Sequence, residues 1–355
     1  MFSRRSLLKG LGWSGAAAGL GGVLRGAAEP AGQQPGPEPA KAPHQMWTPN
    51  PEAVRMARDF PAAGVKKLGI PYRGRIGKVK FPNDARVAAL VFVSLDYYIA
   101  PPVNRRDALF PVDFWELSET SEYNFSIGGW RALELLEKHG VKSTVFANGF
   151  GLLKYPKMHR EYHRLGHEIA AHGWDSRKGM VMYTPQQEAE CIRATTEQVA
   201  EVVGDRPRGW ISPQVQCTER TFGLLAQAGY QWHGDLRDDD IPYLLRIGDR
   251  TLVEIPFRTL TTDDYGCWGV GRSRIGLDPE AALDYFRQVL DLYVETGEDY
   301  PLLMVFGIHP YTGCVPDRSR AIEGFLKYLQ GHPQVWVAQY QAVAEYWKNT
   351  YAAHV

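Results

Sequence analysis

Cysteine is scarce in this chain of 355 residues, which has four cysteines and no Cys-x-x-Cys pair. Zinc ribbons, iron–sulfur clusters and disulfide-dense scaffolds are therefore excluded. An excess of charge of either sign is also absent, because 40 Lys and Arg balance 40 Asp and Glu. Without a basic surface, the chain is not expected to bind nucleic acid. Uncharged apolar runs of bilayer-spanning length are missing too, so we expect no stable membrane span.

The first 28 residues have the composition of an export signal. A basic stretch that holds Arg4 and Arg5 precedes a weakly apolar stretch, residues 10–24, that is rich in Gly and Ala. This arrangement predicts a twin-arginine signal peptide over residues 1–28, recognised by the twin-arginine export machinery. Residues 29–50 are rich in proline and are expected to form an extended linker. We therefore predict a periplasmic or extracellular protein.

From Arg86 onward, apolar runs of strand length alternate with segments of helical periodicity. The expected strands are 87–95, 143–147, 168–171, 209–212, 230–233, 252–257, 302–308 and 335–338. This alternation favours a parallel sheet covered by helices on both faces. About eight units predict a single α/β domain over residues 86–350, built as a closed or nearly closed β/α barrel, with an open doubly wound sheet as the alternative. Residues 51–85 would then be an N-terminal extension.

Polar side chains follow several of the expected strands. Asp96, His172 and His309 come directly after such runs, and Asp240 lies in the acidic segment that follows residues 230–233. Because the carboxyl ends of parallel strands meet at one edge, we expect these side chains to converge. A carboxylate and an imidazole without a Ser or Cys nucleophile are suited to water attack on a carbonyl. The pattern favours an enzyme over a binding protein built on the same scaffold.

Four motifs then resemble the polysaccharide deacetylase family, in that family's order. They are Val91–Asp96 (VFVSLD), Gly166–Trp174 (GHEIAAHGW), Arg206–Trp210 (RPRGW) and Gly307–Pro310 (GIHP). The resemblance implies the NodB-type fold, a distorted β/α barrel. It also implies that Asp96 is the catalytic base, that Arg206 orients this base, and that His309 is the general acid.

The resemblance breaks down at the family's zinc ligands. Such enzymes usually bind zinc through a second acidic residue after the base and through a His-x-x-x-His pair. This chain has Tyr98 and Ser176 at the corresponding positions and retains only His172. A catalytic zinc takes about three protein ligands. We therefore expect no metal cofactor, with zinc bound through His172 as the alternative.

Because it lacks these ligands, the chain resembles the metal-independent, allantoinase-like branch of the family. On this basis we predict that the chain hydrolyses a non-peptide carbon–nitrogen bond, with a small cyclic amide as the first candidate substrate. The alternatives are an N-deacetylase of chito-oligosaccharide or peptidoglycan and a catalytically lapsed glycan-binding protein. The residues expected to contact the substrate are His172, Trp174, Trp210, Asp240 and Tyr243.

Overall fold

A computed structural model describes residues 50–99, 114, 117–257, 267–268 and 276–352. The predicted signal peptide and all but the last residue of the predicted linker lie outside these residues. The strands are β1 Val65–Leu68, β2 Val87–Leu95, β3 Thr144–Ala147, β4 Glu168–Ala171, β5 Gly209–Trp210, β6 Trp232–His233, β7 Tyr243–Ile247, β8 Arg250–Glu254, β9 Leu302–Ile308 and β10 Val335–Ala338. The α-helices are α1 Pro51–Arg58, α3 Gly129–Lys138, α4 Gly149–Lys154, α5 Pro156–Arg164, α6 Pro185–Val203, α7 Glu219–Ala228, α9 Pro279–Thr296, α10 Pro310–Gly313, α11 Ser319–Gln330 and α12 Tyr340–Tyr351.

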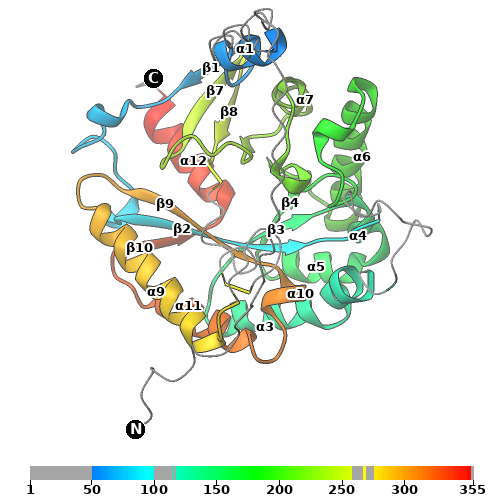
Figure 1. Cartoon of the computed structure of the whole chain (residues 1–355), viewed down its shortest axis with the longest axis vertical. Helices are drawn as coiled ribbons and strands as arrows, with labels where there is room; N and C mark the ends of the chain where they lie inside the picture. The colour runs from blue at the N-terminus through cyan, green and yellow to red at the C-terminus, as the bar shows by residue number, and fades with distance from the viewer. Residues whose placement is uncertain (1–49, 100–113, 115–116, 258–266, 269–275, 353–355) are drawn as a thin grey trace, which may run out of the picture. The chain divides into compact units, whose positions relative to one another are not determined.

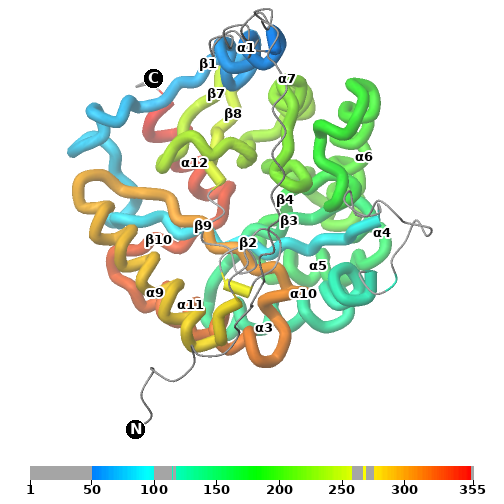
Figure 2. The backbone as a smooth tube through the Cα atoms, viewed as in Figure 1, coloured from blue at the N-terminus to red at the C-terminus, as the bar shows by residue number. Residues whose placement is uncertain are grey.

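The ten strands form one sheet, and eight of them run parallel to one another. The order is β1-β7-β8-β6-β5-β4-β3-β2-β10, and β9 also pairs with β2. Figures 1 and 2 show β2 and β9 side by side, with α3, α9 and α11 packed on the same side of this pair. Only the pairings of β7 with β1 and with β8 are antiparallel among the described strands. The predicted α/β fold with a parallel sheet is confirmed.

Apolar side chains form two cores, one on each face of the sheet. The first contains side chains from α3, α6, α7, α9 and α11, which pack on the sheet from outside. The second contains Phe92, Phe146 and Trp232 from three different strands, together with Tyr340 and Trp347 of α12. The backbone N–H of Leu303 in β9 donates to the carbonyl oxygen of Asp240, 2.9 Å away, so the loop after β6 lies against β9. We refer to the first core as the outer core and to the second as the inner core.

The longest helix, α6, begins and ends where the sequence signals predict. The Thr184 hydroxyl accepts a hydrogen bond from the Gln187 backbone N–H. The Gln187 side-chain oxygen in turn accepts one from the Thr184 backbone N–H, which completes a capping box. Pro185 occupies the first turn, where no hydrogen-bonded N–H is needed. Gly204 ends the helix at a φ of 87°, a left-handed conformation that favours glycine.

The N-terminal extension is part of the same sheet. Its strand β1 pairs with β7 in register from Val65 to Leu68. Farther along, the guanidinium of Arg75, which is 6% exposed, lies 2.7 Å from a carboxylate oxygen of Asp239. Within the described residues, no helix has both the length and the apolar character needed to cross a bilayer.

Candidate functional site

The parallel strands bring Asp96, His172 and His309 to the same edge of the sheet. Each comes directly after the last residue of its strand: Asp96 follows β2, His172 follows β4 and His309 follows β9. In the register of the sheet, Val93 of β2 lies beside Ile308 of β9, so β2 extends two residues beyond the end of β9 at the same edge. Alternate residues of a strand face the same side, which places Asp96 and His309 in phase with the inner side chains Phe92 and Val305.

Asp96 is a buried carboxylate held among hydrogen-bond donors. Only 3% of the residue is exposed, and its Oδ1 lies 3.5 Å from Nε2 of His172. Burial acts to raise the pKa of Asp96. The hydrogen bond and charge of His172, the charge of His309 and a hydrogen bond from Ser176 outweigh burial and lower the pKa to about 2. Asp96 is therefore ionised at neutral pH and able to accept a proton.

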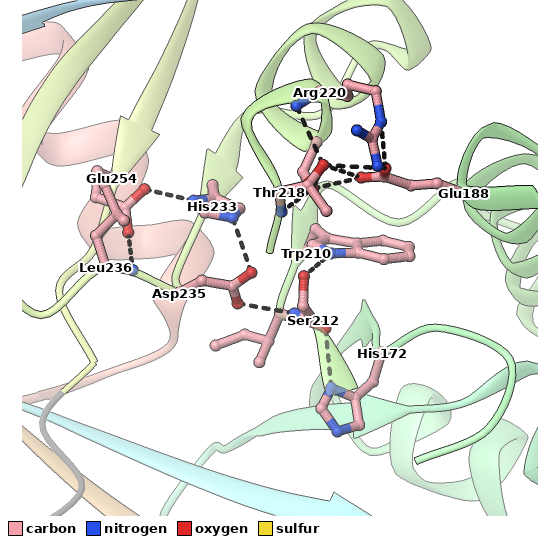
Figure 3. A network of polar contacts seen from close by, with 12 residues as sticks. His172, Glu188, Trp210, Ser212, Thr218, Arg220, His233, Asp235, Leu236 and Glu254 are labelled. Carbon is pink, nitrogen blue, oxygen red and sulfur yellow. Dashed lines mark hydrogen bonds and ion pairs between the residues drawn. The ribbon is translucent and has the colours of Figure 1, made fainter. Parts of the chain in front are cut away.

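The His172 ring is held from its other side by the backbone. Its Nδ1 lies 2.9 Å from the carbonyl oxygen of Ile211, an atom that can only accept, so Nδ1 carries a proton. Nε2 consequently faces Asp96. The next backbone N–H, that of Ser212, donates to Oδ1 of Asp235 at 2.8 Å. Figure 3 shows this sequence of contacts from His172 through the 211–212 backbone to Asp235.

His309 has more solvent access than Asp96. The residue is half-buried, and its ring lies edge-on to Phe92 with 5.7 Å between the ring centres. It is also the N-cap of α10, with Pro310 in the first turn. A partly exposed imidazole near a buried carboxylate could deliver a proton to a leaving group.

Two asparagines that sequence reasoning did not identify fix the loops around Asp96. Asn148, directly after β3, donates to the carbonyl oxygen of Tyr97 at 2.9 Å and to the Ser176 hydroxyl at 2.6 Å. Asn124 donates to the carbonyl oxygen of Asp96 at 2.9 Å. The position of Asn148 after a strand is a signal that could have found it, whereas no strand-end signal marks Asn124.

Comparisons with known proteins agree with this geometry. Residues 128–233 match the family model described as polysaccharide deacetylase. Residues 128–233 are thus similar to polysaccharide deacetylases. The family resemblance predicted from the sequence is thereby confirmed. The match and the relatives described next support a hydrolase that acts on carbon–nitrogen bonds other than peptide bonds.

A Schizosaccharomyces pombe protein that bears the name of a polysaccharide deacetylase is 26% identical over 265 residues, which are 68% of this chain and 80% of that protein. A crystal structure from Mycobacterium smegmatis, also named as a polysaccharide deacetylase, is 26% identical, with a TM-score of 0.67 over 78% of this chain and 94% of that one. The crystal structure of an allantoinase is 22% identical, with a TM-score of 0.70 over 82% of this chain and 98% of that one. The last match shows that the fold is shared.

The zinc that the family resemblance implies finds an incomplete ligand set in this chain. Asp96 and His172 offer two strong donors, and Ser176 adds only a hydroxyl. Tyr98 stands where a carboxylate is expected, and the Arg177 guanidinium lies over its ring at 4.8 Å. Asp175 does not replace it, because the donor atoms of Asp175, Asp96 and His172 are not found grouped within 4.8 Å of one another in the described part of the chain. Three strong donors are not found around Asp96 among the described residues, so the usual catalytic zinc set does not fit.

The structure contradicts the prediction that Arg206 orients Asp96. Arg206 precedes β5, so it lies at the amino ends of the strands, at the edge opposite to Asp96. Its guanidinium is exposed and donates to the carbonyl oxygen of Ala228. It lines a cavity of about 690 Å³ with Glu168 and Gln341. Glu168 is the first residue of β4, at the same amino-end edge, and Gln341 belongs to α12. A motif match alone does not show on which side of a short strand its arginine falls.

The structure also contradicts substrate contact by Trp210, Tyr243 and Asp240. Trp210 is 0% exposed and lies in the outer core, where its Nε1 donates to the Ser212 hydroxyl. Tyr243 is 0% exposed and donates to Asp238. Asp240 lies beside the amino end of β9, where its carbonyl oxygen accepts from Leu303.

Trp174 lies on the loop after β4, close in sequence to His172. The residue is partly buried and lines an open cavity of about 500 Å³ with Tyr183 and Gln187. A Cβ added at Gly149 would come within 2.2 Å of the Trp174 ring, so glycine is needed there to seat the indole. Its predicted contact with substrate stays a prediction.

Proposed function

We propose that this chain hydrolyses an amide by base and acid catalysis, with Asp96 as the base and His309 as the acid. The observation that carries the proposal is the buried, ionised Asp96 carboxylate, held by His172 at the strand edge that also bears His309. An ionised carboxylate removes a proton from water as the water oxygen attacks the amide carbonyl. His309 then gives a proton to the nitrogen as the carbon–nitrogen bond breaks.

His172 is assigned to binding and orientation. The carbonyl of Ile211 fixes the ring, so Nε2 faces the site with little rotational freedom. In its protonated form, Nε2 would donate to Asp96 or to the oxygen that becomes negative when water adds to the carbonyl. A donor fixed before the reaction stabilises such an oxyanion without a reorganisation cost.

A small cyclic amide is the first candidate substrate. Asp96 is 3% and His172 is 7% exposed, which favours a compact reacting group that enters the site fully. An N-acetyl group on a glycan is the second candidate, supported by the match of residues 128–233 to the polysaccharide deacetylase model. We further propose that the twin-arginine pathway exports the chain, which would bring it into contact with either substrate class.

A substrate panel with the full chain tests the proposal. The panel holds five- and six-membered cyclic amides, N-acetylated chito-oligosaccharides and peptidoglycan, each assayed with and without a chelator. Turnover of a cyclic amide that survives chelation, and that Asp96→Asn abolishes, is the expected result. Acetate release from a glycan would favour the second candidate. Binding of glycans with no turnover of any substrate would instead support the lapsed, glycan-binding alternative and overturn the hydrolase.

A further inference from the structure

Four side chains that the proposed reaction does not use form a second polar cluster. Cys217 lies in the loop before α7, His233 ends β6, Asp235 comes two residues after His233, and Glu254 ends β8. One donor atom from each of Cys217, His233 and Asp235 lies within 4.8 Å of the other two. These are thiolate, imidazole and carboxylate donors, the three kinds that zinc prefers. It is the one group of three or more such residues found in the described part of the chain.

The imidazole of His233 is oriented as metal-binding histidines usually are. Its Nδ1 lies 2.5 Å from Oε2 of Glu254, and Oε1 of Glu254 accepts from the Leu236 backbone N–H at 2.8 Å. A metal-binding histidine commonly donates one ring N–H to a carboxylate and presents the other nitrogen to the ion. Figure 3 shows His233 between Glu254 and Asp235.

Asp235 is also held in place by hydrogen bonds, with one carboxylate oxygen facing His233. Its Oδ1 accepts from the Ser212 backbone N–H at 2.8 Å, while its Oδ2 lies 3.1 Å from Nε2 of His233. One carboxylate oxygen is thus fixed by the backbone and the other faces the imidazole. His233 is 0% exposed and Asp235 is 5% exposed, whereas Cys217 is only partly buried.

We propose that Cys217, His233 and Asp235 bind one zinc ion or a similar divalent transition metal, with Glu254 orienting the imidazole. Zinc bonds of about 2.0–2.3 Å place ligand atoms about 3–4 Å apart, and the 3.1 Å between His233 Nε2 and Asp235 Oδ2 already falls in this range. The ion displaces the Nε2 proton of His233 and the thiol proton of Cys217. Two protons leave as a divalent cation enters, so the net charge of the buried cluster does not change.

Cobalt substitution of the full chain tests this site without an activity assay. Purified chain stripped with a chelator is titrated with Co²⁺, and the near-ultraviolet absorption of a thiolate–cobalt bond is recorded. We expect one equivalent of cobalt with this absorption in the wild-type chain and in His172→Ala. We expect Cys217→Ser to lose the absorption and at least tenfold in affinity. Far-ultraviolet circular dichroism of each variant shows whether it is folded.

Glu254→Gln serves as the second variant, because the glutamine keeps the size of the side chain but removes its charge. Its zinc affinity is expected to fall by about 10–100-fold, the usual effect of losing a carboxylate that orients a ligand. Three results would overturn the proposal. They are failure of the wild-type chain to bind cobalt or zinc, binding that Cys217→Ser leaves unchanged, and binding that His172→Ala alone removes, which would place the ion at Asp96.

Discussion

Nε2 of His172 lies 3.5 Å from Oδ1 of Asp96, and Nδ1 of the same ring lies 2.9 Å from the carbonyl oxygen of Ile211. The imidazole therefore connects the loop after β2 to the end of β5. A shift of either loop would move the donor that holds the carboxylate. The position of the proposed base thus depends on two strands that are not neighbours in the sheet.

Asp96→Asn should abolish most of the hydrolysis, because an amide cannot take a proton from water. Loss of a general base typically lowers the rate about 10²–10⁴-fold. The measurement is kcat/KM on the best substrate of the panel, with Ser94→Ala on the same face of β2 as the matched control. Activity of Asp96→Asn within a few-fold of the wild-type value would contradict the assignment.

His309→Gln should lower the rate of hydrolysis most for substrates with a poor leaving group. A poor amine leaving group needs the proton, so its hydrolysis should fall about 10²–10⁴-fold. An activated anilide or ester leaves without protonation and should lose at most roughly tenfold. Comparison of kcat for the two substrates makes the test. Equal losses on both would assign His309 to binding or structure.

Arg206→Ala should leave hydrolysis nearly unchanged, in contrast to the role that the family resemblance implies. Arg206 is exposed at the amino-end edge, where it bonds to Ala228. Surface substitutions of this kind change the free energy of unfolding by about 0.5 kcal/mol or less. We expect kcat/KM to stay within about twofold of the wild-type value, since no contact with the site is lost. A hundredfold loss of kcat/KM would instead support a catalytic role for Arg206.

Gly209→Ala should destabilise the fold. A Cβ at this position of β5 would come within 1.7 Å of the Trp232 ring, and both groups are buried. Overpacking of this kind costs about 1–3 kcal/mol or more in the free energy of unfolding. Gly223→Ala in α7 is the control, because nothing lies within 4 Å of an added Cβ there. It should raise helix stability by up to about 1 kcal/mol. Urea unfolding measures both.

His159 should make the domain less stable as the solution becomes acidic. Burial lowers the pKa of this fully buried imidazole from 6.5 to about 4. The unfolded chain therefore binds the proton at a higher pH than the folded chain does. The effect is absent above pH 6.5 and grows as pH falls towards 4, to about 3 kcal/mol at roughly 1.4 kcal/mol per pH unit.

Unfolding free energies of the wild-type chain and His159→Gln at pH 7 and pH 5 check this effect. The difference between the two pH values should be smaller in the variant. His163→Gln, one turn later in α5 and half-exposed, should behave as the wild type. Equal pH dependence of His159→Gln and the wild type would contradict the shift.

Residues at the ends of the longer strands were placed well by sequence alone. Asp96, His172 and His309 follow apolar runs, and parallel pairing forces such ends to one edge. Arg206 was misplaced because it precedes β5 and so lies at the amino-end edge, whereas Trp210 was misplaced because β5 has only two residues. In so short a strand, a shift of one position moves a side chain from the inner to the outer face. The contact of Asn124 with Asp96 depends on a loop path that no local pattern encodes.

The inner core is incomplete without the last helix of the chain. Tyr340 and Trp347 of α12 are 0% and 1% exposed within the core that also contains Phe92 of β2. The inner face of β2 is synthesised early, but it cannot be covered by α12 until residue 351 has been synthesised. A chain cut short before α12 would expose aromatic side chains of its inner face. Such a truncated chain should therefore bind chaperones or be degraded, so that only completed chains accumulate in the folded form.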